Sequence, residues 1–161
     1  MRGYLNAGGK AFFLPRQVPV AGLGVGLQQA KDFGGSLAVP SWDEVKGVSA
    51  SDVRARSFYD TWLIKSGGEI GADGLLSRVQ VGKGVAIFSQ IEPDILNADT
   101  KTYFRFTRWR QTRANAQILA NLGASFKADG SVFNSSSPEF YHWDYKTDFE
   151  NGDDPYRYYR W

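Results

Sequence analysis

The sequence predicts one α/β domain followed by a C-terminal tail. Short apolar segments typical of buried strands, one long helical segment after residue 102 and a change of composition after residue 128 lead to this prediction. With 161 residues, 42% of them apolar, the chain is long enough to bury one core. We therefore expect an α/β domain over residues 1–128 and an aromatic, acidic tail over residues 129–161.

Three segments have the pattern of buried strands. Residues 8–15 begin with a glycine turn and end at Pro15, which suits a central parallel strand. Residues 54–64 are rich in aromatic and β-branched side chains and predict a strand or two. Residues 75–90 predict a hairpin that turns at the Gly82-Lys83-Gly84 sequence and ends in a buried strand.

One segment predicts a long helix, and another predicts mostly loop. Residues 102–122 place Ala114, Ile118 and Leu122 at four-residue spacing, and Gly123 follows as a stop signal. Residues 16–50 are rich in glycine and proline, so we expect mostly loop there. Within them, Ser41 and Glu44 have the spacing of a capping box, which is a helix-start signal.

Charge separates the body of the chain from its tail. Residues 1–128 hold 16 Lys and Arg against 10 Asp and Glu, whereas residues 129–161 hold 3 against 7. The tail also concentrates tyrosine and tryptophan, and exposed aromatic surface favours association. We expect the tail to be a docking arm, so that deleting residues 138–161 improves solubility.

The candidate catalytic groups are few. The chain has no cysteine, and His142 is its one histidine, so neither a Cys-His pair nor a zinc cluster can form. Close carboxyl pairs occur at 43/44, 92/94 and 153/154, but neighbouring side chains on a loop or strand point apart. We predict no catalytic residue and no metal site.

Two further patterns resemble ligand sites weakly. Residues 22–26 read Gly-Leu-Gly-Val-Gly, but position 27 is Leu and no Walker lysine follows, so we expect a flexible loop and no cofactor. The helical segment carries four arginines, Arg105, Arg108, Arg110 and Arg113. At 100° per residue they surround the helix, which argues against a nucleic-acid partner. We expect them to pair with carboxylates, for which the acidic tail is a nearby source.

Candidate binding residues fall into two groups. The polar group is Ser49, Asp52, Arg54 and Arg56, and the aromatic group in the tail includes Tyr141 and Trp143. In a sugar-binding site both groups would contact the sugar. The aromatic rings would offer an apolar platform for its C–H groups. The alternative, which we favour, is that the aromatic residues anchor the tail to another domain.

Several stretches resemble a known family. They are residues 8–14 (GGKAFFL), 82–91 (GKGVAIFSQI), 105–113 (RFTRWRQTR), 119–124 (LANLGA) and 153–159 (DDPYRYY). The most specific is the arginine-rich run. Together they resemble the glutamine-amidotransferase-like domain of bacterial proteins of the glycoside hydrolase family 2 type, which are similar to β-galactosidases.

The resemblance implies the later portion of a flavodoxin-like three-layer sandwich. Amidotransferases of this class use a Cys-His-Glu triad, so that activity does not transfer to a chain without cysteine. The catalytic barrel of the parent hydrolases needs about 200 residues or more and is not part of this chain. The implied role is a non-catalytic accessory domain for interdomain packing, oligomerisation or substrate shaping, with a carbohydrate-binding module as the alternative.

The expected partners follow from these predictions. They are other domains of a larger parent chain and, in the alternative, carbohydrate or a second copy in a homo-oligomer. No apolar run approaches the roughly 20 residues of a membrane span, so we expect a soluble protein without a membrane partner. The cellular compartment is open, and the resemblance implies a secreted or periplasmic parent.

Overall fold

The computed structural model describes residues 1–93 and 104–125. The body is the unit Met1–Ala124, and a second unit spans Ser125–Trp161. The side chains of residues 56, 57 and 104–106 are not described. The predicted tail at 129–161, including Tyr141 and Trp143, lies outside the described residues, and its boundary stays a prediction.

The body contains helices and sheets, with strands predominating. Its main elements are α1 (Arg2–Asn6), β1 (Lys10–Phe13), β2 (Gly26–Gly35), η1 (Asp43–Val45), α2 (Ala50–Val53), β3 (Arg54–Ser66), β4 (Glu69–Gly71), η2 (Ala72–Gly74), β5 (Leu76–Val81), β6 (Gly84–Ser89) and α3 (Phe104–Asn121). The predicted α/β class is therefore found, with β3, the β5–β6 hairpin and α3 where the sequence placed them.

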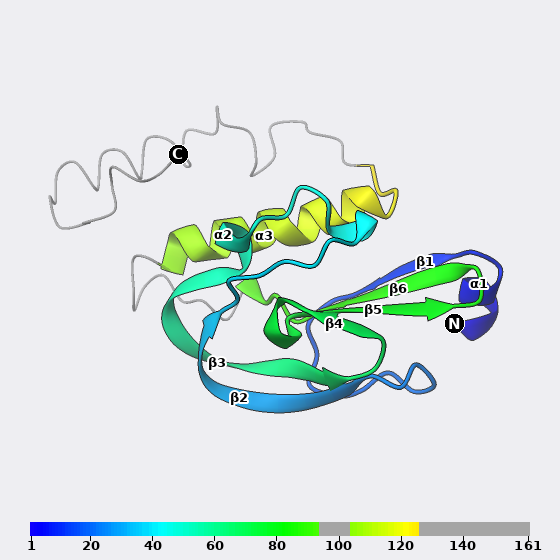
Figure 1. Cartoon of the computed structure of the whole chain (residues 1–161), viewed down its shortest axis with the longest axis horizontal. Coiled ribbons are helices and arrows are strands. Elements are labelled where there is room, and N and C mark those ends of the chain that lie inside the picture. Colours follow the sequence, from blue (N-terminus) through cyan, green and yellow to red (C-terminus); the bar gives the residue numbers. More distant parts are fainter. Residues whose placement is uncertain (94–103, 126–161) are drawn as a thin grey trace, which may run out of the picture. The chain divides into compact units, whose positions relative to one another are not determined.

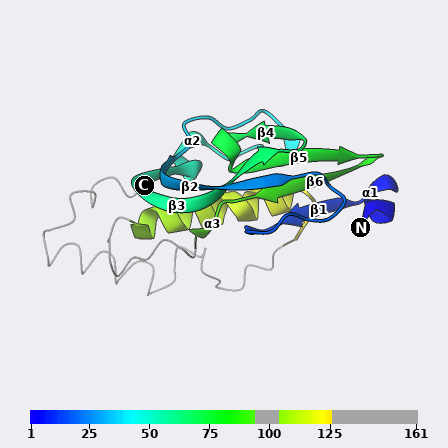
Figure 2. The ribbon, with the colours of Figure 1, turned by 90° about the horizontal axis from the view of Figure 1, so that it is seen from below.

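The strands form two sheets. A four-stranded sheet has the order β1-β6-β5-β4, in which β1 is parallel to β6 and the other pairs are antiparallel. A two-stranded antiparallel sheet joins β2 to β3. Figures 1 and 2 show α3 on one side of the four-stranded sheet and the β2–β3 sheet on the other. The layer opposite α3 is thus a sheet.

Alternate side chains of β6 belong to two different clusters of the hydrophobic core, one on each face of the strand. Val85 and Ile87 belong to the cluster that contains Ala114 and Ile118 of α3. Phe88, on the opposite face of β6, belongs to a second cluster with residues of α1, β3 and β5. Because successive strand residues point to opposite faces, one strand buries both of its sides. This explains why residues 85–88 read as a continuous apolar run.

The helix α3 ends as the sequence predicts. The Gly123 N–H donates to the Ala120 carbonyl at 2.9 Å, and the Ala124 N–H donates to the Leu119 carbonyl at 3.0 Å. Gly123 has a φ of +103°, which a residue with a side chain rarely adopts. The pair of bonds is a Schellman motif, so the carbonyls of the last turn are satisfied.

Hydrogen bonds of polar side chains join α3 to the carboxyl end of β6. Ser89 Oγ donates to Asn115 Oδ1 at 2.9 Å, and Asn115 Nδ2 donates to the Ile91 carbonyl at 2.9 Å. Ser89 and Asn115 are both buried. A buried polar group needs such partners, and the directional bonds fix how α3 lies on the sheet.

Three sequence predictions were wrong in detail. β1 is parallel but lies at an edge of the four-stranded sheet instead of at its centre. Residues 26–35 are a strand, which the pattern missed because its polar residues do not alternate cleanly and its pairing with β3 is non-local. No helix begins at Ser41: a 3₁₀ turn covers 43–45, and Trp42 precedes it without a side-chain cap.

Candidate functional site

Two of the predicted binding residues meet at the start of α2. Asp52 Oδ2 accepts hydrogen bonds from the Ser49 N–H at 2.7 Å and the Ser49 hydroxyl at 2.8 Å. This is a capping box, formed eight residues after the predicted one. Asp52 is 2% exposed, so its carboxylate depends on these partners.

Arg113 of α3 completes the surroundings of Asp52. Its Nε donates to Asp52 Oδ1 at 3.1 Å, and its Nη2 donates to Asp52 Oδ2. The expected carboxylate partner is confirmed for Arg113, and among the described residues it is Asp52 of the body. Arg54 is exposed beside α2, and the Arg56 side chain is not described. Both Asp52 oxygens are engaged in holding α2 to α3.

A second carboxylate cluster surrounds Arg78 of β5. Arg78 Nε lies 3.1 Å from Glu44 Oε2, and Arg78 Nη1 lies 3.1 Å from Glu69 Oε1. Burial acts to lower the pKa of Arg78, but the bonds and charges of Glu44 and Glu69 outweigh it and raise the pKa. Glu44 therefore ties η1 to the sheet.

Half-buried Tyr59 and buried Gln111 form a polar pair between β3 and α3. Gln111 Nε2 donates to the Tyr59 hydroxyl at 3.5 Å, and Gln111 is fully buried. The Gln111 Oε1 atom has no hydrogen-bond partner within residues 1–93 and 104–125. Burial raises the pKa of Tyr59, the Gln111 bond lowers it in part, and Glu92 raises it further.

This pKa shift predicts a loss of stability at high pH. The native state keeps the Tyr59 proton after the unfolded chain releases it near pH 10, so the free energy of unfolding falls above about pH 10. Urea unfolding at pH 9 and pH 11 checks this, with Tyr59→Phe as the control that lacks the phenol. We expect the wild type to lose more stability than Tyr59→Phe, and equal losses would contradict the assignment.

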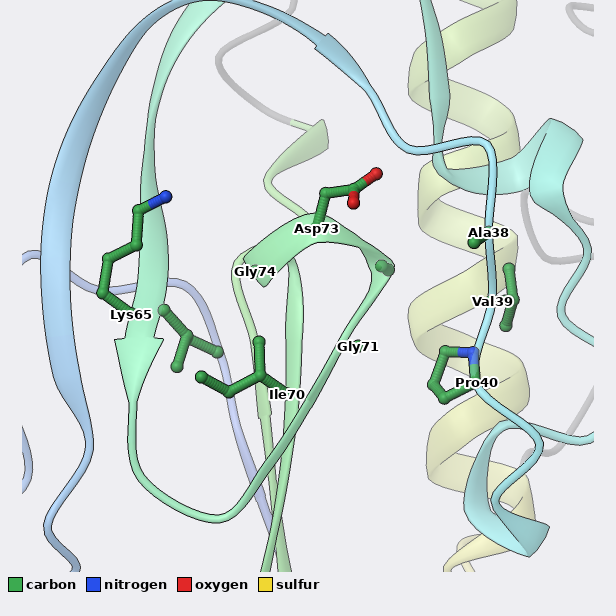
Figure 3. A pocket seen from close by; sticks show the side chains of 10 residues that line it. Ala38, Val39, Pro40, Lys65, Ile70, Gly71, Asp73 and Gly74 are labelled. Atoms are coloured by element: carbon green, nitrogen blue, oxygen red, sulfur yellow. The ribbon is translucent and has the colours of Figure 1, made fainter.

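An open pocket of about 710 Å³ lies between β3, β4 and the segment 38–40. Figure 3 shows Ile70 and Pro40 on its walls, with Lys65 and Asp73 at its rim. The pocket combines an apolar lining with one cationic and one anionic group. None of its residues was among the predicted binding residues.

The turn beside this pocket has an uncommon backbone. Ala72, Asp73 and Gly74 have φ values of +51°, +54° and +95°. Left-handed conformation costs a residue with a side chain roughly 1–2 kcal/mol. The Ser36 hydroxyl donates to Asp73 Oδ2 at 2.7 Å and helps to hold the turn. The sequence signal for it was the Asp-Gly pair at 73–74, which favours a turn.

The remaining sequence patterns have structural roles. Leu23 and Val25 of the glycine-rich stretch 22–26 are buried in the second core cluster, so the stretch is a packed connection rather than a flexible loop. In residues 1–93 and 104–125 no three His, Cys, Asp or Glu side chains gather as metal ligands. Within the same ranges, no helix has the length and apolar character to cross a membrane.

No protein-family model, curated protein or solved structure matches this chain. The family resemblance of the sequence segments therefore stays a prediction.

Proposed function

We propose that the chain is a non-catalytic accessory unit of a larger carbohydrate-processing protein and that its open sheet edge packs against a neighbouring domain. In this proposal the body is part of a flavodoxin-like sandwich. The parallel β1–β6 pair, with α3 on one face of the sheet, supports that assignment, as do the segments that resemble glycoside hydrolase family 2 type proteins.

The observation that carries the proposal is the outer edge of β1. The Gly9 carbonyl accepts from the Val85 N–H at 3.2 Å, so Gly9 points towards β6. In a parallel ladder successive residues point to opposite sides, which directs the backbone groups of Lys10 and Phe12 away from β6. The Tyr4 hydroxyl donates to the Lys10 carbonyl at 3.1 Å. No strand of the described body pairs with Phe12 on this side.

Apolar side chains flank this edge. Tyr4, whose ring lies against Gly9, is 58% exposed, and Leu14, directly after β1, is 63% exposed. An unpaired strand edge beside exposed apolar groups is a template for another polypeptide segment. Lys10 and Pro15, at the two ends of β1, disfavour pairing with arbitrary strands of other chains. The edge is therefore suited to one specific neighbouring domain.

Two carboxylates of the described body, buried Asp52 and half-buried Glu44, support the non-catalytic part of the proposal. Asp52 is held by Ser49 and Arg113, and Glu44 is held by Arg78. General acid–base catalysis of glycoside hydrolysis needs two carboxyl groups that face a shared substrate position. These two carboxylates each serve an ion pair that joins elements of the fold.

Sedimentation velocity of the full chain tests the packing surface. We expect the wild type to self-associate as its concentration rises, because the apolar edge lacks its neighbour, and Leu14→Asp to reduce that association. Gln17→Asp is the matched control, since it adds the same charge at an exposed polar position close by. A wild type that stays monomeric, or equal behaviour of both variants, would overturn the proposal.

A further inference from the structure

One face of β3 presents aromatic rings to solvent. Side chains alternate along a strand, so Phe58, Asp60 and Trp62 share a face. Phe58 is 65% exposed, Asp60 is exposed, and half-buried Trp62 belongs to neither core cluster. On the opposite face Thr61 and Leu63 are each 4% exposed. The exposed stretch ends two residues after Trp62, where the strand turns inward.

The neighbouring strand adds polar groups to this face. Gln29 of β2 lies opposite Trp62, and Ala30 lies opposite the buried Thr61, so Gln29 shares the outer face. The ladder is irregular at the next residues, where the Asp32 N–H donates to Asp60 Oδ1 at 3.2 Å. That bond orients the Asp60 carboxylate. Lys31 is exposed beside it.

The ring of Phe58 lies beside Gly34 of the neighbouring strand. Its ring carbons lie 3.2 and 3.4 Å from the position that a Cβ of Gly34 would occupy. Gly34 therefore leaves space for the ring beside β2. Phe58 is 65% exposed, so most of the side chain is turned to solvent. An aromatic side chain has only two χ angles to fix, so it loses little conformational freedom on binding.

We propose that the outer face of the β2–β3 sheet, formed by Phe58, Asp60, Trp62, Gln29 and Lys31, binds a neutral oligosaccharide. Sugar rings stack their apolar C–H faces on an aromatic ring, and their hydroxyls exchange hydrogen bonds with carboxylate and amide groups. The face provides both kinds of group.

The arrangement also selects against other ligands. Asp32 and Asp60 stand beside Lys31, and carboxylates repel the phosphates of nucleic acids and anionic lipids. Phe58 and Trp62 are four strand residues apart, about 13 Å, which is longer than one sugar ring. The ligand is therefore an oligosaccharide. This proposal is independent of the packing of β1, which lies in the other sheet.

Calorimetric titration of the full chain tests the proposal. The probes are cellohexaose, mannohexaose and xylohexaose, with glucose as the single-ring control. We expect at least one hexasaccharide to bind with a Kd below about 1 mM and glucose to bind more weakly. Phe58→Ala is expected to weaken the binding about tenfold through loss of the stacked ring.

The controls separate binding from folding. Leu37→Ala removes another exposed apolar side chain, which is 70% exposed and lies outside this face, and it should leave the affinity unchanged, while Phe58→Trp should retain it. Circular dichroism establishes that each variant folds. Absence of heat with all three hexasaccharides, or affinity that Phe58→Ala leaves intact, overturns the proposal. Phe58-dependent binding of duplex DNA, anionic vesicles or a second copy of the chain in place of sugar does so as well.

Discussion

Replacing Ile118 by alanine is expected to lower the free energy of unfolding by about 2–5 kcal/mol. Ile118 is fully buried in the cluster that joins α3 to the four-stranded sheet and that also contains Ile87 and Leu76. The substitution removes apolar atoms and leaves a cavity that the rigid sheet fills poorly. Domains of this size are stable by about 5–15 kcal/mol, so the loss should be a large share of the total.

Leu119→Ala is the matched control, because it truncates a neighbouring apolar side chain of the same helix that is outside both core clusters. Urea unfolding followed by circular dichroism measures the two variants. We expect Leu119→Ala to cost less than half as much as Ile118→Ala. Similar losses for both would contradict the packing of α3 described for this fold.

The sequence predicted the β5–β6 hairpin and the end of α3, because neighbouring residues alone determine both. The β5–β6 hairpin follows from alternating apolar residues around the Gly82-Lys83-Gly84 turn, which has Val81 opposite Gly84. The end of α3 follows from Gly123, which occupies the left-handed position of the Schellman motif. In both cases neighbours in the sequence determine the geometry, so no long-range information was needed.

The elements that were missed depend on distant partners. β2 is a strand because it pairs with β3, although Gln28, Gln29 and Lys31 give it no apolar alternation. The sequence of β1 also does not reveal its position at the edge of the sheet, since residues 11–13 are as apolar as those of a central strand. Pairing order is a property of the assembled sheet.

The candidate sites likewise combine contacts between sequence neighbours, which the sequence indicates, with contacts between distant residues, which it does not. Ser49 and Asp52 were predicted, together with Arg54 and Arg56, as sugar-contact residues. In the structure Ser49 and Asp52 form a capping box, which explains their proximity without a ligand. The partner of Asp52 is Arg113, 61 residues away, which no local pattern connects to it. The face of Phe58 and Trp62 also escaped notice, because its orientation depends on which side of β3 meets the core.

Hydrogen exchange of the backbone amides of β1, followed by NMR at a concentration where the chain is monomeric, tests the open edge most directly. The ladder directs the Ala11 and Phe13 N–H groups towards β6 and the Phe12 N–H away from it. We expect Phe12 to exchange at least about 100-fold faster than Ala11 and Phe13, whose exchange requires the sheet to open. Protection of Phe12 equal to that of Ala11 and Phe13 would show that the edge is already covered, and the proposed docking of a neighbouring domain there would be wrong.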